Sequence, residues 1–160
     1  MVEEQIDWRK TVEAILENAN RPFVPISKSF IQQPRGSKER SSVLSQFVTN
    51  GDLRGLKAYL LIAASASSPD TENEWYTSLP LQTWARAFGC SETAGSIATA
   101  KAAATRILLR LQQRGLIEKS RCGKERKIKI KLLAQDGSGE EYQRPASRYI
   151  RLSHDFWKSR

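Results

Sequence analysis

The spacing of apolar residues changes at Gly115, and no other feature of the sequence constrains the fold as strongly. From 96 to 114, apolar residues recur at intervals of three and four, which is the period of an amphipathic helix. From 127 to 133, in KIKIKLL, isoleucine alternates with lysine, the period of a strand with one buried and one charged face. Glycine commonly follows the last residue of a helix. The sequence therefore predicts a long helix that ends at Gly115, with a basic β-hairpin directly after it.

The long helix is expected to have two different faces. One face is apolar and faces the core, while the other is small near its start and basic further along. The predicted buried stripe is Ile97, Ala100, Ala104, Ile107, Leu108 and Leu111, and the opposite face is Thr99, Ala102, Ala103, Arg106, Arg110 and Gln113.

The hairpin is expected to place its lysines on one face. Its strands are predicted over Leu116 to Cys122 and Arg126 to Leu133, joined at Gly123-Lys124. Because successive side chains of a strand point to opposite faces, Lys127, Lys129 and Lys131 should point the same way.

The stretch from Lys101 to Lys131 carries the whole net charge of the protein. It holds eleven Lys and Arg against Glu118 and Glu125, a local balance of +9, which equals the formal net charge of the 160-residue chain. The remaining residues hold 15 basic and 15 acidic groups and cancel. A basic patch confined to one helix–hairpin unit is the electrostatic footprint of a nucleic-acid-binding face.

The chain before the long helix alternates helical and extended segments. Asp7 is expected to cap a first helix that ends by Asn20, because Pro22 and Pro25 force an extended path. Asn50-Gly51 marks the end of a short helix from 41 to 49. The residues expected to face inward are Trp8, Val12, Ile15, Leu16 and Ala19 in the first helix, and Val43, Leu44, Phe47 and Val48 in the short one.

Three further elements are predicted before residue 96 and one after the hairpin. A helix opens at Asp52 or Leu53, Trp75 to Leu79 forms a short strand, and a helix begins at Pro80 and stops at Gly89. A last short strand covers Arg148 to Leu152. The expected inward residues are Leu56, Tyr59, Leu60 and Ala63 in the first of these helices, and Leu81, Trp84, Ala85 and Phe88 in the second.

We expect three segments. Residues 1–50 form an N-terminal helix and extended arm, 51–134 the main domain, and 135–160 a loop, a short strand and an aromatic tail. The arm from Phe23 to Ile31 is apolar enough to pack on something, either its own domain or a second subunit. Both readings remain open at this stage.

Several function classes are disfavoured by the sequence. It has no apolar run near twenty residues and no signal-peptide pattern, so a cytoplasmic protein without a membrane span is expected. Cys90 and Cys122 are expected as free thiols, and His154 is the single histidine, so no metal site is predicted. Residues 136–139, DGSG, lack the ligand pattern of a calcium loop. With no phosphate-binding glycine loop and no nucleophile motif either, neither an enzyme nor a cofactor is expected.

The order helix, short strand, helix, turn, longer helix and two-stranded basic hairpin resembles the winged helix-turn-helix fold of bacterial regulators and plasmid or phage replication initiators. The fold class expected is thus α+β and mostly helical. The connection from Gly89 to Ser96 is longer than the usual turn of such units. The segments that carry the resemblance, within 53–133, are LPLQTWARAFG, CSETAGS, IATAKAAATRILLRLQQRGLIE and RCGKERKIKIKLL.

The resemblance implies sequence-specific binding of double-stranded DNA, with the long helix in the major groove and the hairpin, or wing, on the phosphate backbone. A transcriptional regulator, or a plasmid or phage replication or maintenance factor, is the expected role. Ser96, Thr99, Lys101 and Ala103 would lie nearest the bases and Arg106 and Arg110 nearer the phosphates. The wing residues implied in backbone binding are Arg121, Lys124, Arg126, Lys127 and Lys129.

Two other functions are compatible with parts of the sequence to different degrees. Winged helices also act as protein-interaction adaptors, in which case the Phe23–Ile31 arm and residues 154–157 would dock the partner. RNA binding is disfavoured because no aromatic pair is spaced along a strand for base stacking.

Overall fold

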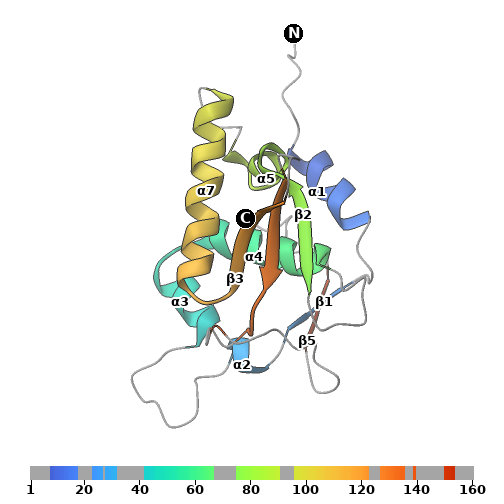
Figure 1. The fold of residues 1–160 in the computed structure, drawn as a ribbon. Helices are drawn as coiled ribbons and strands as arrows, with labels where there is room; N and C mark the ends of the chain where they lie inside the picture. Colours follow the sequence, from blue (N-terminus) through green and yellow to red (C-terminus); the bar gives the residue numbers. More distant parts are fainter. Residues whose placement is uncertain are drawn as a thin grey trace.

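The computed structural model describes residues 8–17, 23–26, 28–31, 42–66, 75–90, 96–122, 127–135, 139 and 150–153. These residues form an α+β fold, as expected, with a small antiparallel sheet among helices (Figure 1). In chain order the elements are α1 (Trp8–Glu17), β1 (Phe23–Ile26), α2 (Lys28–Ile31), α3 (Val43–Thr49), α4 (Leu53–Ser65), β2 (Tyr76–Pro80), α5 (Leu81–Ala87), α7 (Ile97–Gln113), β3 (Ile117–Cys122), β4 (Lys127–Leu132) and β5 (Ile150–Ser153).

Helix α4 lies at the centre of the fold and is buried on nearly all sides. It contacts α1, α3, α7, β1 and β2, and in Figure 1 it runs behind the sheet. The sequence predicted an inward stripe on this helix, but five successive residues from Ala58 to Ile62 are buried, whereas Leu56 and Ala63 are only partly buried. Burial on all sides is typical of a central helix.

The three-stranded sheet has the order β2-β4-β3 and is antiparallel throughout. Strand β4 lies in the middle, with Ile130 paired to Thr77 on one side and to Lys119 on the other. Ile130 and Leu132 are fully buried, so the predicted alternation of buried and charged positions along this strand is confirmed for the described side chains.

Gly115 ends α7 as predicted. It adopts a φ of +74°, which is readily accessible to glycine. Its N–H donates to the carbonyl oxygen of Gln112, and the N–H of Leu116 donates to that of Leu111. This pair of bonds is a Schellman motif, and the buried side chains of Leu111 and Leu116 accompany it. The chain therefore turns directly from α7 into β3.

The apolar arm packs on its own chain. Ile26 and Phe30 are buried, and the Phe30 ring stacks on Tyr59 of α4 with centroids 5.4 Å apart. Strand β1 pairs with β5, so that the position of Phe23 lies opposite that of Ser153. Of the two readings left open by the sequence, these described residues adopt the one in which the arm covers its own domain.

One hydrophobic cluster joins the segments that the sequence analysis separated. Val12 and Ile15 of α1 belong to it together with the core of 51–134, and Leu152 of β5 packs against it. Val48, expected to face inward, is 70% exposed. In the two-turn helix α3, the positions four apart, Val43 and Phe47, take the buried face, and Val48 lies on the other side.

Several predictions lie outside the described residues. These are the cap at Asp7, residues 91–95 of the connection before α7, the turn at 123–126, most of the loop 136–149, and the tail 154–157 with His154.

Candidate nucleic-acid interface

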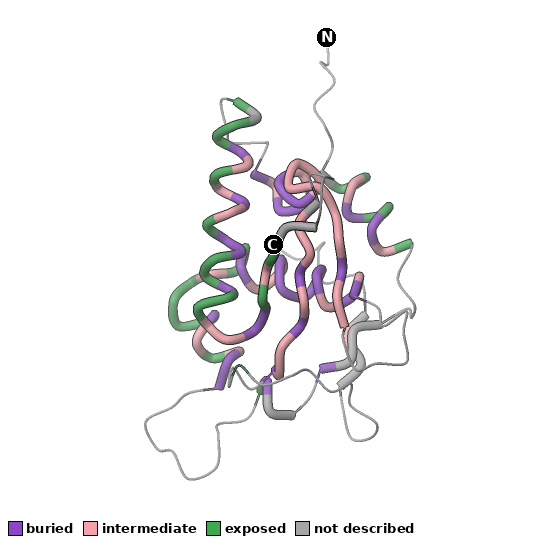
Figure 2. Tube along the Cα trace, in the orientation of Figure 1, coloured by how far each residue is buried: buried purple, intermediate pink, exposed green. Residues whose placement is uncertain are grey.

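Helix α7 lies at the edge of the molecule, with one side in the core and the other exposed. In Figure 2 its tube alternates between buried and exposed residues along its whole length. The inner side packs on α5, α4 and β3. Of the predicted stripe, Ala100, Ala104, Ile107, Leu108 and Leu111 are all buried. The exposed side is thus free for contacts with another molecule.

The first turn of α7 is capped by Ser96. The Thr99 N–H donates to Ser96 Oγ at 3.1 Å, and the two hydroxyl oxygens lie 2.9 Å apart. Serine is a favoured residue at this position because its oxygen satisfies an otherwise unpaired N–H. Both residues are exposed, as contact with bases would require, but the Ser96 hydroxyl oxygen already accepts the hydrogen bond that caps the helix.

The exposed side is small in its first half and basic in its second. Ala98, Thr99 and Ala102 are exposed, and Arg106 follows one turn after Ala102. Arg106 Nε donates to the carbonyl oxygen of Ala102 at 3.4 Å. Small side chains let the helix backbone approach a partner closely, and an exposed arginine beside them supplies a charged hydrogen-bond donor.

Lys101 does not lie beside Thr99. Positions two apart on a helix differ by about 200°, so Lys101 sits on the opposite flank of the exposed side. Lys101 and Ala103 are only partly exposed. Of the four residues expected nearest the bases, Ser96 and Thr99 are thus exposed, and Lys101 and Ala103 are partly exposed, while Ala102 and Arg106 are exposed beside Thr99.

The C-terminal end of α7 is fixed by Asp52. Arg110 Nη2 lies 3.8 Å from Asp52 Oδ1, and Arg114 Nη2 lies 3.7 Å from Asp52 Oδ2. The Arg114 side chain is 17% exposed and its guanidinium carbon lies 4.5 Å from the centre of the Phe47 ring, whereas the Arg110 side chain is 51% exposed. The Arg110 side chain is exposed enough to contact a phosphate, whereas the Arg114 side chain stabilises the fold through Asp52 and Phe47.

Asp52 is placed by the ends of two helices. Its N–H donates to the carbonyl oxygen of Phe47 at the end of α3, and its Oδ1 accepts from the Gly55 N–H at the start of α4. A side chain at position 55 would collide with the Asp52 carboxylate. The sequence indicated Asp52 only as a possible start of this helix, because nothing in the local pattern indicates the two arginines of the α7 segment.

The hairpin places its basic residues on both faces of the sheet. Lys129 and Lys131 alternate with buried Ile130, so they lie on the outer face, where Lys129 Nζ is 4.5 Å from the centre of the Tyr76 ring. Lys119 pairs with Ile130 and lies on the inner face with it. The positive charge of the hairpin is therefore divided between the outer and the inner face of the sheet.

The other wing residues are only partly described. Arg121 pairs with Ile128, and Lys127 pairs with Pro80 and Cys122, in the backbone register of the sheet, but their side chains are not described. Lys124 and Arg126 lie outside the described residues. The register places this end of the hairpin beside Pro80, at the start of α5.

Cys90 is a buried free thiol at the end of the α5 segment. Burial raises the pKa of this thiol, and the positive charge of Arg54 opposes the shift. A thiol with a raised pKa stays protonated at neutral pH, which makes it a poor nucleophile and a poor metal ligand. Within the described residues, no three His, Cys, Asp or Glu residues gather as a metal site would require.

Comparison with protein-family models, with curated proteins and with solved structures found no match to this chain. None of the helices in the described part of the chain has the length and apolar character needed to cross a bilayer.

Proposed function

We propose that this chain is a winged helix-turn-helix protein that binds double-stranded DNA, with α7 in the major groove and the β3–β4 hairpin as the wing. The order α4, β2, α5, α7, β3, β4 and the sheet order β2-β4-β3 support this proposal. Such proteins read base edges with one helix and hold the backbone with surrounding basic groups.

The observation that carries the proposal is the composition of the exposed side of α7. No acidic residue occurs from 96 to 113. The exposed residues run from Ser96 and Thr99 through Ala102 to Arg106 and Arg110, with Leu109, Gln112 and Gln113 exposed beside the two arginines. Small and hydroxyl-bearing side chains at the start suit close approach to base edges. The arginines further along suit the phosphates.

The positions and contacts of these residues support different roles for them in DNA binding. Thr99 and Arg106 share the centre of the exposed side, Lys101 lies on its flank, and Arg110 is shared with Asp52. Lys129 and Lys131 add a positive outer sheet face. We propose that Thr99 contributes to sequence preference and that Arg106, Arg110 and Lys129 contribute mainly to affinity.

The biological role proposed is that of a cytoplasmic transcriptional regulator or a plasmid or phage replication or maintenance factor. A homodimer or partner contact through the Phe23–Ile31 arm would have to use residues other than Ile26 and Phe30, because both are buried in the same chain.

A salt titration of duplex binding tests the proposal. If five or six phosphates are engaged, the logarithm of the association constant falls with a slope of about −5 against the logarithm of the salt concentration. Neutralising Arg106 and Lys129 together, with Arg106→Gln and Lys129→Gln, should reduce the slope by about 2.

The matched control neutralises two exposed cations on α1, with Arg9→Gln and Lys10→Gln. Helix α1 and helix α7 lie on opposite sides of the molecule in Figure 1, so the slope should not change. A duplex affinity that does not depend on salt, or no duplex binding at low salt, would refute the proposed function.

A further inference from the structure

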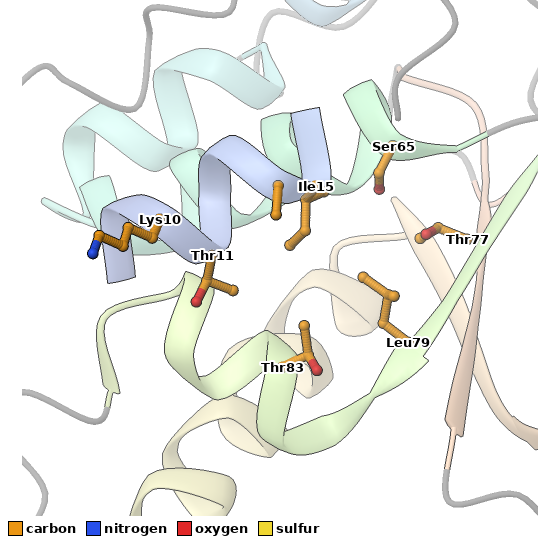
Figure 3. Close-up of a pocket in the computed structure, with 8 residues that line it drawn as sticks. Lys10, Thr11, Ile15, Ser65, Thr77, Leu79 and Thr83 are labelled. Carbon is orange, nitrogen blue, oxygen red and sulfur yellow. The ribbon is translucent and has the colours of Figure 1, made fainter. Parts of the chain in front are cut away.

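A cavity of about 460 Å³, open to solvent, lies beside α1 (Figure 3). Its walls come from α1, the C-terminal end of α4, strand β2 and the first turn of α5. Cavities of roughly 300–1,000 Å³ hold small organic molecules in proteins. Because α1 packs on both α4 and α5, the space is formed by elements of the core.

Four hydroxyl groups line the cavity, one from each wall: Thr11, Ser65, Thr77 and Thr83. In Figure 3, Thr11 of α1 and Thr83 of α5 lie toward one end, while Ser65 and Thr77 lie toward the other. The Ser65 hydroxyl donates to the carbonyl oxygen of Ile62 at 3.0 Å, which leaves its oxygen as an acceptor. Hydroxyls on several walls can orient a molecule that has a polar group of its own.

The rest of the lining is apolar or faces away. Ala14, Ile15 and Leu79 supply apolar surface. Lys10 is the single charged residue among the described lining residues, and Figure 3 shows its ammonium group pointing away from the others. With the Lys10 ammonium group turned away, the described lining offers an ion no opposite charge, and its surface is mostly apolar. The lining therefore favours a neutral molecule.

We propose that this cavity binds a small neutral organic molecule with an apolar body and a hydroxyl group, of which a phenol is the simplest example. The apolar surface holds the body, and hydroxyls at one end of the cavity, that of Thr83 among them, pair with the polar group. Helix α5 lines the cavity with Thr83 and also packs on α7. Occupancy is therefore expected to change DNA affinity, and this last part rests on the proposed function.

Titration of the full-length, ¹⁵N-labelled protein with p-cresol and with toluene, followed by NMR, tests the site. The amide signals of Ala14, Ser65, Thr77 and Thr83 should shift in a saturable way, with a p-cresol Kd of about 1 mM or lower. Toluene, which lacks the hydroxyl, should bind at least threefold more weakly. Equal affinities would overturn the role of the hydroxyls, and shifts scattered away from the lining would overturn the site.

Ala14→Leu provides the decisive variant, because Ala14 is exposed on α1 and a larger side chain there fills the cavity without entering the core. It should raise the p-cresol Kd at least tenfold. Glu13→Leu adds the same side chain at the neighbouring exposed position, which does not line the cavity, and should leave the Kd unchanged. An unchanged Kd in Ala14→Leu would refute the site.

A second variant guards against a folding defect in the first. Thr83→Val keeps the shape and removes one hydroxyl, so the p-cresol Kd should approach that of toluene. Saturating p-cresol should also change duplex affinity at least threefold. If duplex affinity does not respond, the coupling is wrong while the site stands; if the protein binds no duplex at all, the proposed function fails instead.

Discussion

Arg114 holds its guanidinium carbon 4.5 Å from the centre of the Phe47 ring, so the last basic residue of the α7 segment packs against a core side chain. The same group lies 3.7 Å from Asp52. A cation over an aromatic ring is attracted by the ring's negative face, more strongly when water is excluded. Of the basic residues from 101 to 131, this one is therefore set apart from nucleic-acid contact.

Exchanging the two arginines for methionine should separate stability from DNA binding. Arg114→Met should lower the free energy of unfolding by about 2 kcal/mol, since the nearly buried Asp52 loses a partner. Arg110→Met should cost less than about 1 kcal/mol, because the Arg110 side chain is half exposed, but should weaken duplex binding roughly fivefold. Urea unfolding and fluorescence anisotropy measure the two effects, and the same profile for both variants would contradict the assignment.

Gly55→Ala should destabilise the protein even though alanine favours helices. The added Cβ collides with the Asp52 carboxylate, which caps α4 and pairs with α7. We expect a loss of about 1 kcal/mol. In an Asp52→Ala background the collision is gone, so Gly55→Ala should stabilise by about 0.5–1 kcal/mol. Urea unfolding of the four proteins gives this cycle, and additive effects would show that the collision is not the cause.

Thr99→Val and Lys129→Gln should affect DNA binding in different ways. Thr99→Val removes a hydroxyl at the exposed start of α7 but keeps the backbone bond to Ser96. The comparison uses a duplex selected from a random pool and a shuffled version of it. Thr99→Val should change the difference in binding free energy between these two duplexes by about 1 kcal/mol or more. Lys129→Gln should weaken both equally. If both variants change the ratio of the two affinities, the proposed position of α7 in the groove is wrong. Lys10→Gln is the control and should change the affinity for neither duplex.

Cys90 should make the fold sensitive to alkaline pH. Burial raises the pKa of this thiol above its usual value of 9.0, so the unfolded chain releases the proton first as pH rises. Stability from this group is complete below the unfolded pKa and is lost as pH rises through the folded pKa. Urea unfolding between pH 7 and roughly 10.5 should show a steeper loss for the wild type than for Cys90→Ala. Parallel pH profiles would contradict this prediction. The comparison isolates the thiol from Lys57, whose pKa is lowered by burial.

Local periodicity predicted the elements around Gly115 well. The buried stripe of α7, its end at Gly115 and the alternation along β4 depend on neighbouring residues alone, so they can be read from the sequence. The short strand before α5 was also expected, and the structure shifts it by one residue to Tyr76–Pro80.

Contacts between distant segments could not be predicted in this way. The pairing of Asp52 with Arg110 and Arg114 joins residues that are about sixty positions apart and on different elements. The position of Lys101 on the flank of α7, by contrast, follows from helix geometry and can be read from the sequence. The division of the hairpin charge between two faces required the register of Lys119 with Ile130.

The pairing of β1 with β5 has a consequence for synthesis of the chain. Position 23 pairs with position 153, about 130 residues later. A ribosome completes α4, α5, α7 and the hairpin long before it reaches residue 153. Strand β1 must therefore wait without its partner strand until residue 153 has been made, so a chain that is stalled or truncated before that residue would expose the edge of β1 to other nascent proteins.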